Sequence, residues 1–158
     1  MKFLRLIPRF RLVPSQYSPH RLSIRSSRVH RFGVFALESI PKGRKVIEYA
    51  GERLTWTEAA RQVRRRERQG APMNVYFARL NRRWIIDGSV GGSGAQFINH
   101  SCDGNLGARK IRGHLLFFSR RRIRAGEELS FDYRLSRESP TLECRCGSPK
   151  CRGTVNRK

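Results

Sequence analysis

The sequence predicts one β-rich domain that carries one or two helices, and three observations support this fold class. The chain has 158 residues, a length typical of a single domain with a core of its own. From residue 34 onward, short apolar runs alternate with turn residues, which is the pattern of strands. One segment has the start and stop signals of a helix, whereas a βαβ array would need a helix after each strand.

Six segments combine β-branched or aromatic residues with turn residues nearby, so each is predicted as a strand. They are VFAL (34–37), KVIEY (45–49), VYFARL (75–80), RWIID (83–87), HLLFFS (114–119) and ELSFDY (128–133). Residues 1–24 carry three prolines and no acidic residue. We interpret them as a basic arm or an edge segment, with an organellar presequence as the alternative.

The helix is predicted to begin at Thr55, because Thr55 and Glu58 have the spacing of a capping box. Gly70 supplies a stop signal. The segment 61–68 has too few apolar residues to bury a broad face, so it is interpreted as a solvent-exposed helix edge. A nucleic-acid contact is the alternative.

The composition is strongly basic, with a formal net charge of +22. Arginine accounts for 28 of the 34 basic residues, which fits either phosphate recognition by guanidinium groups or a GC-rich genome. The total charge predicts attraction to nucleic acid or acidic surfaces. No apolar run is long enough for a membrane helix, so no membrane partner is expected.

Three of the four cysteines, Cys144, Cys146 and Cys151, lie within eight residues of one another. Cysteines one residue apart are poorly placed to bridge each other, and a closed structural zinc site needs four ligands. Cys102 is the remaining cysteine, so the sequence predicts one structural zinc ion held by these four residues. Two disulfides in a secreted protein are the alternative, but the N-terminus lacks the features of a secretory signal.

Six motifs in order resemble the SET-domain protein-lysine methyltransferases with a zinc-binding post-SET tail. They are FGVFALESIPKG (32–43), VIEYAGE (46–52), VYFARLNRRWIIDGS (75–89), FINHSCDGN (97–105), GEELSFDY (126–133) and CRCGSPKCRGT (144–154). The resemblance implies the β-clip fold of that family, small sheets around a knot-like core. It divides the chain into the arm (1–24), a SET domain (25–136) and a post-SET tail (137–158).

The resemblance also implies a reaction, methyl transfer from S-adenosyl-L-methionine to the ε-amine of a protein lysine. Tyr133 matches the principal active-site tyrosine, and Tyr76 matches the tyrosine that lines the lysine channel. Phe131 occupies the product-specificity position, where phenylalanine implies di- or trimethylation. Such an in-line displacement depends mainly on alignment, which a neutral tyrosine hydroxyl can provide.

The cofactor-binding residues implied by the resemblance are Asn99, His100, Phe32 and Gly33. The glycine cluster at 91–94 lacks the G-x-G-x-x-G spacing of a dinucleotide site, in agreement with a family that binds its cofactor differently. Four positions depart from the family pattern, and two of them are Ser93 and Gln96, where the family often has asparagine and arginine. Arg31 replaces a glycine of the first cofactor loop, and Gly104 stands where proline is usual.

The expected partner is a protein substrate that presents a lysine: a histone, a histone-like protein or another nucleic-acid-associated protein. The compact, arginine-biased chain resembles bacterial members, which would place it in the cytoplasm or, after export, in a host nucleus. A eukaryotic source would place it in the nucleus or an organelle. The alternatives are a catalytically degenerate SET fold that binds nucleic acid, and an arginine-rich zinc module without methyl chemistry.

Overall fold

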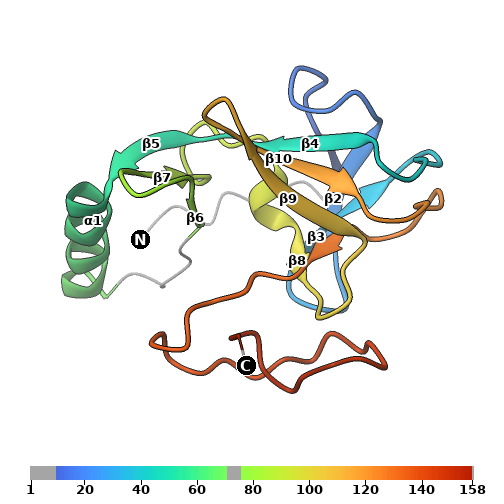
Figure 1. Ribbon diagram of the computed structural model, residues 1–158. Helices are drawn as coiled ribbons and strands as arrows, with labels where there is room; N and C mark the ends of the chain where they lie inside the picture. The colour runs from blue at the N-terminus through green and yellow to red at the C-terminus, as the bar shows by residue number, and fades with distance from the viewer. Residues whose placement is uncertain (1–9, 71–75, 158) are drawn as a thin grey trace.

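The computed structural model describes residues 10–70 and 76–157, which form four small β-sheets and one α-helix (Figure 1). One sheet has the order β1-β2-β3: Phe10–Leu12, Leu22–Ser26 and Phe32–Ala36. A second has the order β4-β10-β9: Lys45–Tyr49, His114–Ser119 and Leu106–Ile111. A third has the order β5-β7-β6: Glu52–Thr55, Trp84–Asp87 and Phe77–Arg79. The fourth pairs β11, Ser130–Phe131, with β8, Asn99–His100.

The predicted β-rich fold is confirmed, and all six predicted strands contain a strand in the structure. The strands at 45–49 and 114–119 have the predicted bounds, whereas β3 begins two residues earlier than expected. Val75, in the predicted strand 75–80, lies outside the described residues. The prediction missed β1, β2, β5, β8 and β9. β9 reads LGARKI and is mostly exposed, so its sequence lacks the apolar signal of a core strand.

Residues 10–24, which we interpreted as part of an arm, contribute β1 and the start of β2 to the first sheet. β1 is its edge strand, in agreement with the edge alternative, and β2 lies between β1 and β3. Leu22 and Ile24 on β2 are each 1% exposed and join the main core with Val34 and Ala36 of β3. The structure therefore places this segment within the domain, while residues 1–9 of the predicted arm lie outside the described part.

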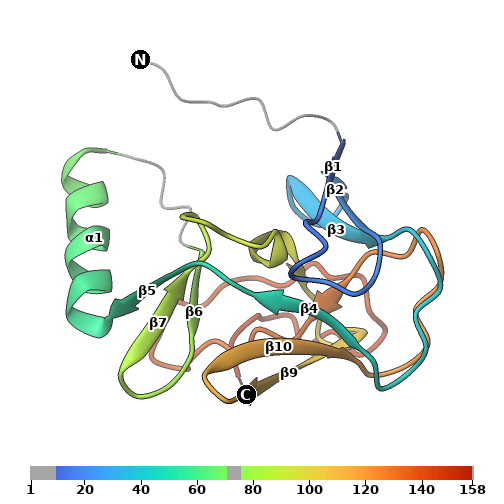
Figure 2. The ribbon, with the colours of Figure 1, turned by 90° about the horizontal axis from the view of Figure 1, so that it is seen from above.

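The helix α1, Trp56–Arg68, begins with the predicted capping box. Thr55 Oγ1 accepts a hydrogen bond from Glu58 N at 3.3 Å, and a Glu58 carboxylate oxygen accepts one from Thr55 N at 2.7 Å. Gly70 follows with a positive φ of 60°, a conformation that glycine adopts at little cost. Only Ala59 of α1 is buried, and the helix packs against β5 and β7 at one end of the molecule (Figures 1 and 2).

The crossing of two chain segments at the parallel pair β8–β11 forms the centre of the fold. Asn105, 2% exposed, accepts a hydrogen bond from Ser130 N at 3.0 Å and donates one to Glu128 O at 2.9 Å. A Cβ on Gly104 would lie 2.5 Å from Phe131 Cα, so the close approach requires glycine here. The expected fold, small sheets around a crossed core, is confirmed.

Residues 135–157 run beside the body without helix or extended strand (Figure 1). Isolated bridges join Leu135 to Asn156 and Glu143 to Thr154. The buried Asn156 side chain accepts a hydrogen bond from Leu142 N at 3.0 Å and donates one to Ser136 O at 2.8 Å. A buried polar side chain thus helps to organise this tail, whose other buried residues in the described part are Cys144 and Val155. Within the described ranges, α1 is too short and too polar to span a membrane.

Candidate active site and metal centre

Tyr133 lies two residues after the end of β11 and contacts His100 of β8. Its hydroxyl donates a hydrogen bond to Ile98 O at 2.6 Å, and its backbone N–H donates one to His100 Nδ1 at 3.2 Å. Burial, with smaller contributions from Tyr76 and Glu128, raises the pKa of Tyr133 above its ordinary value. The hydroxyl is therefore protonated at neutral pH, although the residue as a whole is 37% exposed. It can orient a group through hydrogen bonds but cannot serve as an anionic base.

Two further aromatic side chains predicted for the site lie near this tyrosine. The Phe131 ring packs 4.6 Å from that of Phe117 and 4.8 Å from that of Tyr133. The Tyr76 ring contacts Phe97 at 5.7 Å, edge to face. Aromatic walls of this kind exclude water and favour the neutral form of an amine placed between them.

Asn99 and Glu128 form a polar pair beside these aromatic residues. Asn99 Nδ2 donates hydrogen bonds to Glu128 Oε1 at 2.7 Å and to Phe32 O at 2.9 Å, and the Ser27 hydroxyl donates to Glu128 at 2.8 Å. A Cβ on Gly33 would overlap the Glu128 carboxylate, so the glycine makes room for that side chain. Sequence reasoning missed Glu128, because a charged residue at the start of a strand is more often solvent-exposed.

The residues around Asn99 fit S-adenosyl-L-methionine. No hydrogen bond within the described residues reaches Asn99 Oδ1, so this acceptor can receive an ammonium proton. The Phe32 ring packs 6.0 Å from Phe97, which leaves an aromatic surface next to Asn99 and the buried His100. Arg31 adopts a positive φ of 32° and is exposed, which explains why the family prefers glycine there.

The four cysteines converge as predicted, with all four Sγ atoms within 4.8 Å of one another and no disulfide among them. Cys102 Sγ and Cys144 Sγ lie 3.7 Å apart. Tetrahedral bonds of about 2.3 Å to zinc would separate two sulfurs by about 3.8 Å, so the cluster fits zinc. Burial raises the pKa of Cys144 to about 12. Burial would also raise the pKa of Cys146, but backbone N–H groups outweigh it and lower that pKa to about 6.

Two links connect the cysteine cluster to Tyr133. His100 Nδ1 accepts the Tyr133 N–H, so in the neutral ring Nε2 carries the proton and can donate it to Cys102 Sγ at 3.4 Å. Arg152 donates hydrogen bonds to both Asp132 oxygens, at 2.8 and 2.9 Å. Sequence reasoning missed this ion pair. The pair could have been inferred from the positions of its members, because Arg152 directly follows a predicted zinc ligand and Asp132 directly precedes the predicted catalytic tyrosine.

The structure thus brings the predicted residues into two adjoining groups. The first holds the residues predicted for catalysis and cofactor binding: Tyr133, Tyr76, Phe131, Phe32, Gly33, Asn99 and His100. The second holds Cys102, Cys144, Cys146 and Cys151. Their individual roles in catalysis and binding remain predictions.

The sequence from residue 31 to residue 134 matches the family model of the SET domain. This chain belongs to the SET domain family. Its paired strands β8 and β11 lie in two of the six motifs that carry the resemblance, FINHSCDGN and GEELSFDY. Membership of the SET domain family is consistent with the β-rich fold of the structure. It is also consistent with the glycine cluster at 91–94, which lacks the spacing of a dinucleotide-binding motif.

Relatives of this SET domain are named as histone-lysine N-methyltransferases. It is 39% identical over 140 residues to "Histone-lysine N-methyltransferase TRX1" of Oryza sativa subsp. japonica, an alignment that covers 86% of this chain and 14% of the relative. It is 39% identical over 134 residues to "Histone-lysine N-methyltransferase, H3 lysine-4 specific" of Schizosaccharomyces pombe, over 82% of this chain and 14% of the relative. It is 34% identical over 145 residues to "Histone-lysine N-methyltransferase SETD1B" of Homo sapiens, over 89% of this chain and 7% of the relative.

A solved structure also resembles this SET domain. The crystal structure of the Chaetomium thermophilum polycomb repressive complex 2 superimposes with a TM-score of 0.64 at 30% identity, over 71% of this chain and 15% of that chain. The chain therefore spans only a small part of each of these relatives.

Proposed function

We propose that this SET domain transfers a methyl group from S-adenosyl-L-methionine to the ε-amine of a protein lysine. The observation that carries the proposal is the hydrogen bond of 2.6 Å from the Tyr133 hydroxyl to Ile98 O. This bond fixes a protonated phenol next to Phe131 and close to the proposed cofactor residues. The names of the relatives support the same reaction.

The cofactor supplies an activated methyl group on a sulfonium, so the protein's main task is alignment. Asn99 Oδ1 would accept a proton from the cofactor's ammonium group, and the Phe32 ring would cover the cofactor. Tyr133 keeps its proton on the bond to Ile98, so its oxygen lone pairs can face the incoming methyl group and amine. The aromatic rings of Tyr76 and Phe131 would exclude water and thereby lower the pKa of the substrate lysine.

Phe131 leads us to propose di- or trimethyl-lysine as the product. Its ring packs between Phe117 and Tyr133 and carries no hydroxyl that could hold a water or hydrogen-bond a methylated amine. At this position no polar group would therefore prevent a mono- or dimethylated amine from rotating before the next methyl transfer.

The proposed substrate is a histone, a histone-like protein or another protein that resides on nucleic acid. The relatives' names specify histone lysines. A chain with a net charge of +22 repels an isolated basic tail, whereas nucleic acid under that tail would neutralise the repulsion. We therefore expect transfer to be faster on a tail presented by a protein–DNA assembly than on the free peptide.

We also propose that zinc is structural, because four cysteines close the coordination and leave no open position for substrate. The metal would hold the tail, and through Cys102 and His100 it would support the main chain at Tyr133.

The test is methyl transfer from isotopically labelled S-adenosyl-L-methionine to purified histones and bacterial histone-like proteins, each with and without DNA. Mass spectrometry would locate the label on lysine. Tyr133→Phe is the matched variant, since it removes only the hydroxyl and should lower the rate by roughly 10²-fold or more. Undiminished transfer by this variant would remove Tyr133 from the mechanism, and label on residues other than lysine would refute the proposed reaction.

A further inference from the structure

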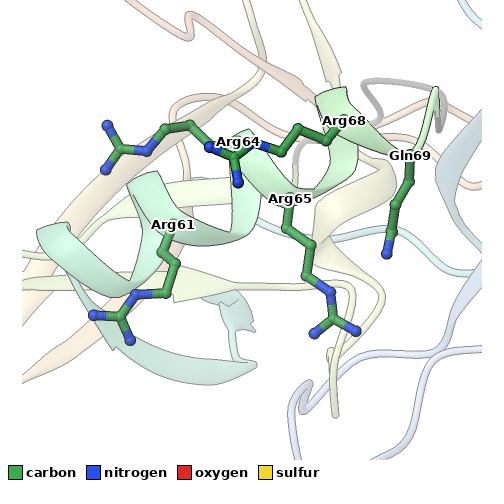
Figure 3. Close-up of a pocket in the computed structure, with 5 residues that line it drawn as sticks. All are labelled: Arg61, Arg64, Arg65, Arg68 and Gln69. Atoms are coloured by element: carbon green, nitrogen blue, oxygen red, sulfur yellow. The ribbon is translucent and has the colours of Figure 1, made fainter.

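The outer face of α1 carries a row of arginines. Arg61, Arg64, Arg65 and Arg68 follow one another at i, i+3, i+4 and i+7, which places them on one side of a helix, and all four are exposed. Together with Gln69 they line an open pocket of about 450 Å³ (Figure 3). We call these four residues the α1 arginine face.

The α1 arginine face is not explained by the stability of the fold. Like charges three and four residues apart repel each other and destabilise a helix. None of the four forms an ion pair with another described residue. Glu58, the acidic residue of the first turn, is occupied by the capping box with Thr55. α1 has two acidic residues, Glu58 and Glu67, against these four arginines, so the α1 arginine face keeps an excess of positive charge.

The chemistry of this face matches phosphate better than a protein partner. From residue 61 to residue 69 every exposed side chain is polar or charged, so the face lacks the apolar residues on which a protein interface depends. Guanidinium groups bind phosphate oxygens through two parallel hydrogen bonds. The seven-residue span from Arg61 to Arg68 covers about 10.5 Å along the helix axis. Measured along the axis of a duplex, that span corresponds to about three phosphate steps of one strand.

We propose that the α1 arginine face binds the phosphodiester backbone of nucleic acid, without reading its base sequence. α1 packs on β5 and β7 at one end of the molecule, away from the crossing of β8 and β11 (Figures 1 and 2). Nucleic acid bound there leaves Tyr133 accessible, so the two sites can be occupied together. This inference does not depend on methyl transfer and would hold for a SET domain with any substrate.

The experiment measures affinity for a fluorescent 20-base-pair DNA duplex of arbitrary sequence over a series of salt concentrations, with the full chain loaded with zinc. The test variant replaces Arg61, Arg64, Arg65 and Arg68 by glutamine. The control variant replaces four other exposed cations by glutamine, so that the net charge falls equally; they are Arg21, Lys42, Arg44 and Arg112. Thermal unfolding verifies that both variants fold.

The expected result is that the test variant binds at least tenfold more weakly at 100 mM salt. The slope of log affinity against log salt should decrease by about 3, because each lost phosphate contact contributes about 0.9. The control should change both quantities by less than half as much. Equal losses in the two variants would mean that binding is spread over the whole basic surface and would overturn the proposal. Affinity for poly-glutamate is measured in the same way. A test variant that keeps its affinity for DNA but loses affinity for poly-glutamate would also overturn the proposal, since that result assigns the α1 arginine face to an acidic protein.

Discussion

Arg152 and Asp132 form a two-armed ion pair between the C-terminal tail and the strand end that carries Tyr133. Nη1 and Nη2 of Arg152 donate, at 2.8 and 2.9 Å, and the two side chains are only 20% and 21% exposed. Because Arg152 follows Cys151 and Asp132 precedes Tyr133, the pair ties the cysteine cluster to the proposed catalytic residue. A second tie runs from Cys102 through His100 to the Tyr133 N–H.

Arg152→Gln should destabilise the tail, because the partly buried Asp132 carboxylate loses its two-armed partner and keeps as a charged partner only the exposed Arg134, at 3.8 Å. We expect a loss of about 1–3 kcal/mol in the free energy of unfolding, measured by urea denaturation. Arg145→Gln is the matched control, since Arg145 pairs with Glu143 at 2.8 Å on an exposed surface, where such pairs contribute little. Equal effects of the two substitutions would contradict a special role for the Arg152–Asp132 pair.

The same pair predicts a pH dependence. Burial would raise the pKa of Asp132, but hydrogen bonds from Arg152 and the Arg134 N–H outweigh it and lower that pKa below its ordinary value. A lowered pKa means stability that is present above about pH 4 and is lost as the pH falls through the folded-state pKa. Asp132→Asn should therefore be less stable than the wild-type chain at pH 7. The difference should shrink steadily below pH 4, and a difference independent of pH would refute this assignment.

Cys102→Ser should abolish zinc binding, because the cluster would keep three thiolates and a poor fourth ligand. Metal analysis of the purified chain should decrease from about one zinc to nearly none, and limited proteolysis should then cleave between residues 137 and 158. Ser101→Ala is the neighbouring control, since its hydroxyl only accepts the Asp103 N–H within the described contacts. A Cys102→Ser chain that retains its full zinc content would show that Cys102 is not a ligand.

Phe131→Tyr should shift the products toward monomethyl-lysine. The added hydroxyl would sit beside Tyr133, where it can hold a water or the methylated amine and block the rotation needed for a second transfer. The ratio of mono- to di- and trimethyl-lysine, read by mass spectrometry of the substrate, is the relevant measurement. Phe118→Tyr, on β10 beneath Arg109, serves as control and should leave the ratio unchanged. An unaltered ratio in Phe131→Tyr would remove Phe131 from product control.

The sequence singled out Tyr133, Asn99 and the four cysteines because of the motifs in which they stand. The structure brings these residues close together, and their roles stay predictions. Glu128, Asp132 and Arg152 stand in the same motifs but were not singled out, since a charged residue is expected at the surface and only the tertiary structure places its partner beside it. Their pairing joins segments that are 20 or more residues apart in the chain.

The fold was likewise predicted where the signal is local. β4 and β10 are apolar runs with clear ends, and their bounds were predicted correctly. β8 and β11 contain two residues each and pair with each other, so neither has a periodic signal of its own. β11 was predicted only as part of the longer run 128–133, and β8 was missed. β2 reads LSIRS, in a segment where prolines and basic residues suggested an arm, yet Leu22 and Ile24 belong to the core.

The most direct test of the proposed methyl-transfer site is calorimetric titration of the zinc-loaded chain with S-adenosyl-L-methionine, with Asn99→Ala as the control variant. We expect saturable binding to the wild-type chain and at least about tenfold weaker binding to the variant, which loses the Oδ1 acceptor. Thermal unfolding of both proteins would verify that the variant keeps its fold. A folded, zinc-loaded wild-type chain that produces no saturable heat, or a variant that binds equally well, would contradict the proposed methyl-transfer site.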